Sequence, residues 1–169
     1  MKRDVDIVII SDVHLGTYGC HAKELLNYLN SIRPKKLILN GDIIDIWQFK
    51  KRYWPKSHMK ILKKIIDLAS KKTKVYYISG NHDEMLRKFI PQKMGNLIFK
   101  NSLILNLGDK KIWIFHGDIY DFTMKTTKWL AMLGGHGYDL LILINITLNK
   151  ILKKLGRDKV SFSKKIKNS

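Results

Sequence analysis

The chain has 169 residues, of which 45% are hydrophobic and 10% aromatic, so it can fold around one buried core. Its 32 Lys and Arg residues outnumber 14 Asp and Glu residues, and the net charge of +18 favours an anionic partner: nucleic acid, an acidic membrane surface or a phosphorylated small molecule. A single cysteine, Cys20, excludes an intrachain disulfide, and no apolar run reaches the ~20 residues that span a membrane. We therefore expect a cytoplasmic protein that can touch a membrane surface.

The first part of the chain alternates predicted strands and helices. Apolar runs predict strands over residues 5–10, 37–39 and 75–78. Apolar residues at helical spacing predict amphipathic helices over residues 21–33, where a proline follows, and 58–72. The strand–helix–strand–helix–strand order predicts a parallel sheet with right-handed crossovers, and the fold class is therefore α/β.

The pattern changes in the second part of the chain. Two β-rich segments, residues 102–107 and 111–115, flank a Gly-Asp-Lys turn and predict a hairpin. Two helical segments follow over residues 122–133 and 139–155, and a glycine-rich stretch around His136 is expected to form a loop between them.

We divide the chain into a core over residues 1–121, a hydrophobic helical insert over 122–156 and a basic tail over 157–169. The insert is apolar on nearly all sides, so it must be buried or must contact something apolar. Basic residues flank it: Lys125, Lys128, Lys150, Lys153, Lys154 and Arg157. They suit an anionic membrane surface, and solvated helix ends explain them nearly as well.

Polar side chains follow four of the predicted strands. They are Asp12 and His14; Asp42 and Asp45; Asn81, His82 and Asp83; and His116 and Asp118. Because adjacent parallel strands lie about 4.8 Å apart, clusters at their ends converge. Carboxylates, imidazoles and an amide without cysteine suit Mn, Fe or Zn. One shared carboxylate would create a two-metal centre with ions about 3.5–4 Å apart.

These clusters form four sequence motifs: Asp12-x-His14, Gly41-Asp42-x-x-Asp45, Gly80-Asn81-His82-Asp83 and His116-Gly117-Asp118. In this order they resemble the successive blocks of the calcineurin-like metallophosphoesterases, whose fold is an αββα sandwich. More narrowly, Ser-Asp-x-His-Leu-Gly, Gly-Asp-x-x-Asp-x-Trp and the helical insert resemble the branch that hydrolyses UDP-2,3-diacylglucosamine in lipid A synthesis. The resemblance covers nearly all of residues 5–155.

The resemblance implies a role for each metal-ligating residue. Asp12 and His14 would bind the first metal ion, and Asp42 would bridge both ions. Asn81 and His116 would bind the second ion. The metals implied are two divalent ions, with Mn as the first choice and Fe or Zn as alternatives.

The resemblance also implies catalytic and supporting residues. His82 would face the phosphoryl group and stabilise its developing charge or assist the leaving group, with Asp83 as its orienting partner. Asp45 would support the ligands from behind. We further expect Asp118 and Asp121 to hold a sugar or nucleotide hydroxyl, and Lys125 to hold a phosphate.

The chain departs from the family pattern after the insert. The family continues with a strand and a Gly-His-x-His block, whose two histidines complete the metal sites. Here Gly135-His136-Gly137 is followed by Tyr138, so nothing matches that block. We therefore expect a chain shortened at its C-terminal end, with weaker metal binding and low activity.

Three functional hypotheses follow. The leading one is hydrolysis of the pyrophosphate of UDP-2,3-diacylglucosamine to lipid X and UMP, at the inner membrane surface. The resemblance implies that the insert covers the acyl chains of that substrate, whereas ordinary core packing explains the insert equally well. The second hypothesis is a nuclease or other phosphodiesterase of the superfamily, which suits the charge of +18 but leaves the insert unexplained. The third is a non-catalytic scaffold with a degraded metal site.

Overall fold

The computed structural model describes residues 2–51, 53–120 and 128–154. The chain divides into two compact units, Met1–Asp121 and Phe122–Ser169. The first unit carries the strand-end motifs, and the second contains one long helix.

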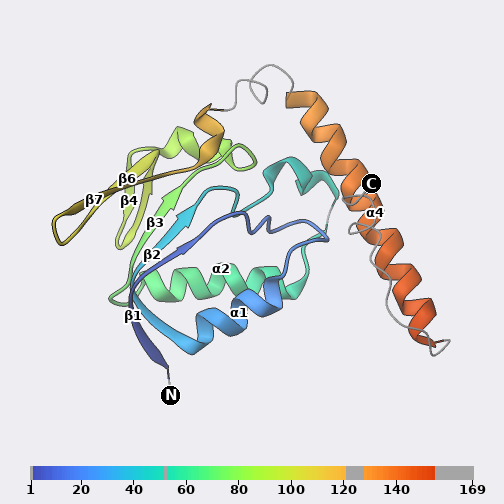
Figure 1. Ribbon diagram of the computed structural model, residues 1–169, viewed down its shortest axis with the longest axis horizontal. Coiled ribbons are helices and arrows are strands. Elements are labelled where there is room, and N and C mark those ends of the chain that lie inside the picture. Colours follow the sequence, from blue (N-terminus) through green and yellow to red (C-terminus); the bar gives the residue numbers. More distant parts are fainter. Residues whose placement is uncertain (1, 52, 121–127, 155–169) are drawn as a thin grey trace. The chain divides into compact units, whose positions relative to one another are not determined.

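A five-stranded sheet forms the centre of the first unit (Figure 1). Its strands, in spatial order, are β1 (Arg3–Ile10), β2 (Ile32–Asn40), β3 (Lys74–Ile78), β5 (Leu97–Lys100) and β4 (Gln92–Met94). The first four run parallel, and only β4 is antiparallel to its neighbour. The α/β fold class with a parallel sheet is therefore confirmed.

Two helices, α1 (Ala22–Ser31) and α2 (Lys56–Ala69), lie on one face of this sheet (Figure 1). Their apolar stripes, which include Leu29 and Ile61, pack with the sheet residues Leu37 and Val75 in one buried cluster. Each of these four side chains is nearly inaccessible to solvent. The helical spacing of apolar residues in the sequence is therefore explained by contact with the sheet.

The opposite face of the sheet is covered by a hairpin of β6 (Ser102–Leu107) and β7 (Lys110–Phe115). The antiparallel pairing of these two strands confirms the predicted hairpin. Leu103 and Ile114 of the hairpin pack against Ile38 and Ile78 of the sheet in a second buried cluster. The first unit therefore has three layers: helices, central sheet and hairpin. Three short 3-10 helices complete it: η1 (Ile46–Lys51), η2 (Glu84–Phe89) and η3 (Gly117–Tyr120).

The predicted end of the first helix is wrong by two residues. Helix α1 ends at Ser31, and Ile32 and Arg33 begin strand β2. The apolar Ile32 continues the helical spacing, but it pairs with Arg3 of β1 and is 1% exposed, so sheet pairing overrides local periodicity. The short strands β4 and β5 have no counterpart in the sequence prediction.

The second unit contains helix α4 (Lys128–Lys154). Its backbone is helical without interruption through residues 134–137, so the loop expected around His136 is wrong. Glycine disfavours a helix by only about 1 kcal/mol per residue, which the apolar helix formers on both sides offset. Among the described residues, no helix is both long enough and apolar enough to cross a membrane.

Candidate metal centre

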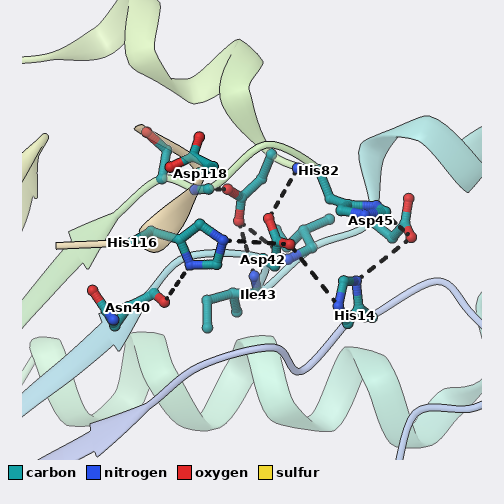
Figure 2. Close-up of polar contacts among 12 residues, drawn as sticks. His14, Asn40, Asp42, Ile43, Asp45, His82, His116 and Asp118 are labelled. Carbon is teal, nitrogen blue, oxygen red and sulfur yellow. Dashed lines mark hydrogen bonds and ion pairs between the residues drawn. The ribbon is translucent and has the colours of Figure 1, made fainter. Parts of the chain in front are cut away.

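The four polar segments meet where β1, β2, β3 and β7 end (Figure 2). Several backbone hydrogen bonds join the first pair of loops. Among them, the Asp12 N–H donates to the Gly41 carbonyl at 3.1 Å, and the His14 N–H donates to the Asp42 carbonyl at 2.9 Å. The Asn40 side chain donates to the Phe115 carbonyl at 3.2 Å, which joins the end of β2 to the end of β7. The predicted convergence of strand ends is therefore present in the fold.

Asp42 lies at the centre of this cluster and is 4% exposed. Its Oδ2 atom is 3.6 Å from His116 Nε2 and 4.0 Å from His14 Nε2, and Figure 2 shows it between these two rings. Its Oδ1 atom accepts a hydrogen bond from the His82 N–H at 2.9 Å. Burial raises the pKa of Asp42, an effect that a nearby cation would offset.

Two groups of potential ligand atoms share Asp42. In one group it lies with His14 and His82, and in the other with Asp12 and His116; within each group the ligand atoms are no more than 4.8 Å apart. The resemblance pairs Asp12 with His14, whereas the structure places the Asp12 atoms near His116. The assignment of each residue to one ion stays a prediction, as does the role of Asn81, a half-buried residue just after β3.

His116 is oriented by the backbone. Its Nδ1 atom lies 3.1 Å from the Asn40 carbonyl oxygen. A carbonyl only accepts, so Nδ1 donates its proton to it, and Nε2 lies on the side of Asp42. This is the arrangement in which a histidine binds a metal through one nitrogen while the other donates to a supporting group.

Asp45 holds two of the histidines. Its Oδ2 atom lies 2.9 Å from His82 Nδ1 and 3.6 Å from His14 Nδ1, and Oδ1 accepts from the Gln48 N–H at 3.1 Å. Burial raises the pKa of Asp45, but the hydrogen bonds with His14 and His82 outweigh it and lower the pKa to about 2. Asp45 therefore remains ionised and fixes the orientation of both rings. The Trp47 ring packs against the His82 ring, with the ring centroids 4.2 Å apart.

Asp83 was expected to orient His82, and the structure gives it different partners. Its Oδ2 atom accepts hydrogen bonds from the Tyr77 hydroxyl at 2.7 Å and the Ile43 N–H at 2.9 Å. Its Oδ1 atom accepts from the Gly80 N–H at 2.6 Å. Asp83 is fully buried and joins the loop after β2 to the loop after β3, while Asp45 takes the place next to His82.

The backbone of the cluster is strained at three of the candidate ligands. Asp12, His14 and Asp42 have φ values of 54°, 51° and 54°, a left-handed conformation that costs non-glycine residues about 1–3 kcal/mol each. Such strain is concentrated at functional sites. Two glycines make room for the side chains: a Cβ atom on Gly41 would overlap the His116 ring, and one on Gly80 would overlap the Asp42 carboxylate.

Sequence reasoning missed His58, which supports the first loop. It is 2% exposed in α2, and its Nδ1 atom accepts a hydrogen bond from the Gly16 N–H at 3.0 Å. Burial lowers its pKa, which keeps the ring neutral and able to accept. The Trp54 ring packs edge-on against it, with the centroids 5.7 Å apart. The sequence did contain a signal for this role. His58 lies on the apolar stripe of the predicted helix, so it could have been expected to be buried.

Asp118 is the one expected substrate-binding residue that the structure describes. Arg87 forms an ion pair with its Oδ2 atom, a partner that no sequence motif indicates. Its Oδ1 atom is buried, and no donor among the residues in the described ranges reaches it. Asp121 and Lys125 lie outside the described residues.

The donor set fits divalent metal ions. Each group offers one shared carboxylate and at least one imidazole, a combination suited to Mn, Fe or Zn rather than to soft metals. The buried Asp42, with three imidazoles near it, is a carboxylate that can contact two ions at once. With divalent ions bound, a cluster of this kind can bind and orient a phosphate ester.

Comparisons with known proteins agree with this chemistry. The profile of the calcineurin-like phosphoesterase family matches residues 5–161. The chain is 33% identical to the UDP-2,3-diacylglucosamine hydrolase of Blochmanniella pennsylvanica over 119 residues, which cover 68% of this chain and 47% of that protein. It is 29% identical to the protein of the same name from Porphyromonas gingivalis over 121 residues, which cover 66% of this chain and 45% of the relative. The chain thus spans about half the length of the curated relatives it matches.

Proposed function

The chain belongs to the calcineurin-like phosphoesterase family, and on that premise we propose that it is a hydrolase that cleaves the pyrophosphate bond of UDP-2,3-diacylglucosamine and releases UMP and lipid X. The observation that carries the hydrolase proposal is the pair of ligand groups that share the buried Asp42. The substrate proposal is supported by the name that the relatives carry.

Two divalent ions, Mn²⁺ in the first instance, are the proposed cofactors. When bound, they activate a water molecule and neutralise charge on the phosphoryl group. Asp42 would be shared between the two ions, and Asp12, His14, Asn81 and His116 would supply further ligand atoms. The backbone holds these ligands: the Asn40 carbonyl keeps the proton of His116 on Nδ1, so that Nε2 is free to bind.

His82 is the proposed catalytic residue. Asp45 accepts a hydrogen bond from its Nδ1 atom, which orients the ring and leaves Nε2 directed away from that contact. When Nε2 carries a proton, it can donate to a phosphoryl oxygen or to the departing oxygen. Asp83 acts at a distance as a positioning residue, because it fixes the loop that carries His82 and the loop that carries Asp42.

The sugar or nucleotide end of the substrate is proposed to meet Asp118. Arg87 holds one carboxylate oxygen of Asp118, which leaves the buried Oδ1 atom as an acceptor for a substrate hydroxyl. Asp121 and Lys125 are proposed to contribute a second carboxylate and a cation for a phosphate. Replacing Asp118 by alanine should then raise KM more than it lowers kcat.

The acyl chains are proposed to contact the insert of residues 122–156. Helix α4 exposes large apolar side chains such as Leu140, Leu141 and Ile144, which are 59%, 44% and 46% exposed. Aliphatic chains are a chemically matched partner for that surface. The same surface, with its flanking lysines and the basic tail over 157–169, supports peripheral contact with the inner leaflet of a cytoplasmic membrane.

The test is release of UMP from UDP-2,3-diacylglucosamine by the metal-free chain, with and without added Mn²⁺. We expect slow, Mn-dependent release that Asp42→Asn abolishes and that Asp109→Asn, an exposed carboxylate in the β6–β7 turn, leaves unchanged. His82→Ala should lower kcat while the variant still binds two ions. If the variant instead binds one ion fewer, His82 is a metal ligand rather than a catalytic residue.

Two outcomes would contradict the proposal. Mn-dependent cleavage of DNA or of bis(p-nitrophenyl) phosphate, without any release of UMP, would keep the hydrolase and overturn the substrate. A chain that binds no Mn²⁺ at millimolar concentration and cleaves none of the three substrates would favour a non-catalytic scaffold.

A further inference from the structure

A basic cavity of about 500 Å³ lies at the end of the central sheet where β2 and β3 begin. It is formed by the first residues of β2, the last turns of α2, the connection from α2 to β3, and the N-terminal residue next to β1. Six basic side chains line it: Lys2, Arg33, Lys35, Lys64, Lys71 and Lys72. Asp67 is the one acidic residue among its lining residues.

The walls of the cavity are built into the fold. The buried Thr73 hydroxyl donates to the Pro34 carbonyl at 2.7 Å and joins the connection before β3 to the start of β2. Ile32 and Leu68, which also line the cavity, are 1% and 8% exposed. The basic side chains therefore surround a recess with an apolar wall, rather than standing separately on a helix surface.

The charges around the recess are only partly balanced. Arg33 pairs with Asp4 at 3.1 Å and Lys35 with Asp6 at 2.7 Å, and all four side chains are highly exposed. No carboxylate of the described residues forms an ion pair with Lys64, Lys71 or Lys72. Burial, together with the charges of Lys2 and Lys71, lowers the pKa of Lys64, as expected where cations face one another. An anion in the recess would relieve this repulsion.

The basic cavity is separate from the metal centre. The cavity lies at the beginning of β2, and Asp42 follows the other end of that nine-residue strand. A strand rises about 3.3 Å per residue, so the two sites lie on the order of 25 Å apart. One small ligand cannot bridge them, and the motifs of the metal centre do not explain the cavity.

We propose that the basic cavity binds a soluble phosphorylated small molecule, with the lysines around its phosphate groups and the apolar wall against the rest of the ligand. Clustered ammonium groups recognise phosphate as point charges. A recess of this volume falls in the range that accommodates small ligands, about 300–1,000 Å³. The proposal is independent of the proposed hydrolase activity, because none of its residues belongs to the metal centre.

The test uses the metal-free full chain labelled with nitrogen-15 and inorganic pyrophosphate as the probe, at constant ionic strength. Amide shifts are expected at Ile32, Arg33 and Lys35 and at residues 71–73, and not in the loops around Asp12 and Asp42. Lys71→Glu/Lys72→Glu should weaken binding about tenfold or more, because it reverses two exposed charges at the recess. The matched control, Lys110→Glu/Lys111→Glu, reverses two exposed charges in the β6–β7 hairpin and should retain the affinity within about twofold.

Three results would overturn the proposal. Equal weakening by both double variants would show a general effect of net charge. Shifts confined to the metal-centre loops would place the anion there. Binding of phosphatidylglycerol vesicles without any binding of pyrophosphate would make the recess part of a membrane-contact surface. Because the probe is used without metal, failure of the hydrolase assay has no bearing on these results.

Discussion

Replacing Asp83 by asparagine is expected to destabilise the chain severely. The fully buried carboxylate accepts hydrogen bonds from the Ile43 N–H, the Tyr77 hydroxyl and the Gly80 N–H, and a longer one from the Ile44 N–H at 3.4 Å. Asparagine keeps one acceptor oxygen, so its NH₂ group must face a buried donor, which costs about 1–3 kcal/mol. The remaining bonds lose their ionic character, and the combined loss should be about 3–5 kcal/mol.

The assay is urea denaturation of the metal-free protein, followed by circular dichroism, with a thermal melt as a second measurement. For a chain of this length, the expected loss corresponds to a fall in Tm of about 10 °C. Asp109→Asn removes an exposed carboxylate and should change stability by less than about 0.5 kcal/mol. A loss below about 1 kcal/mol for Asp83→Asn would refute the argument that this carboxylate joins the two ligand loops.

Three further predictions follow from particular contacts. Gly41→Ala should weaken Mn²⁺ binding at least about tenfold in calorimetry, because the added methyl group would overlap the His116 ring. The control is Gly108→Ala, which should leave Mn²⁺ binding unchanged: Gly108 also has a positive φ, but a methyl group there would meet no atom within 4 Å. The depressed pKa of Asp45 means that its contribution to stability is present above the ordinary value near 3.8 and is lost as the pH falls through about 2; Tm measured against pH should show this loss, and Asp45→Asn should remove it. Burial raises the pKa of Cys20 to about 11 from an ordinary 9.0, so thiol reagents should react at pH 8 on the order of a hundredfold more slowly than with free cysteine, which timed alkylation will measure.

The sequence predicts the parts of the fold that have strong local signals. Continuous apolar runs end in polar motifs, and the rule that parallel strand ends share one edge of a sheet brings Asp12, Asp42 and His82 together. The short strands Gln92–Met94 and Leu97–Lys100 have no such signal, because three or four residues are too few to show a period. Their pairing depends on contact with β3, which a local pattern does not contain.

The supporting interactions of the site show a second limit of sequence reasoning. Asp83 is adjacent to His82 in the chain, yet its carboxylate points to other donors, and Asp45, 37 residues away, holds His82. Neighbours in sequence at a loop turn their side chains in different directions, so adjacency alone does not identify a hydrogen-bond partner.

The central claim is that Asp42 joins two metal ions at the meeting point of four strand-end segments. Electron paramagnetic resonance of the metal-free chain titrated with Mn²⁺, alongside calorimetry, tests it most directly. The account predicts two ions per chain with the spectrum of a coupled pair, and loss of that coupling in Asp42→Asn. A single isolated ion in the unaltered chain, or a coupled pair that survives Asp42→Asn, would contradict it.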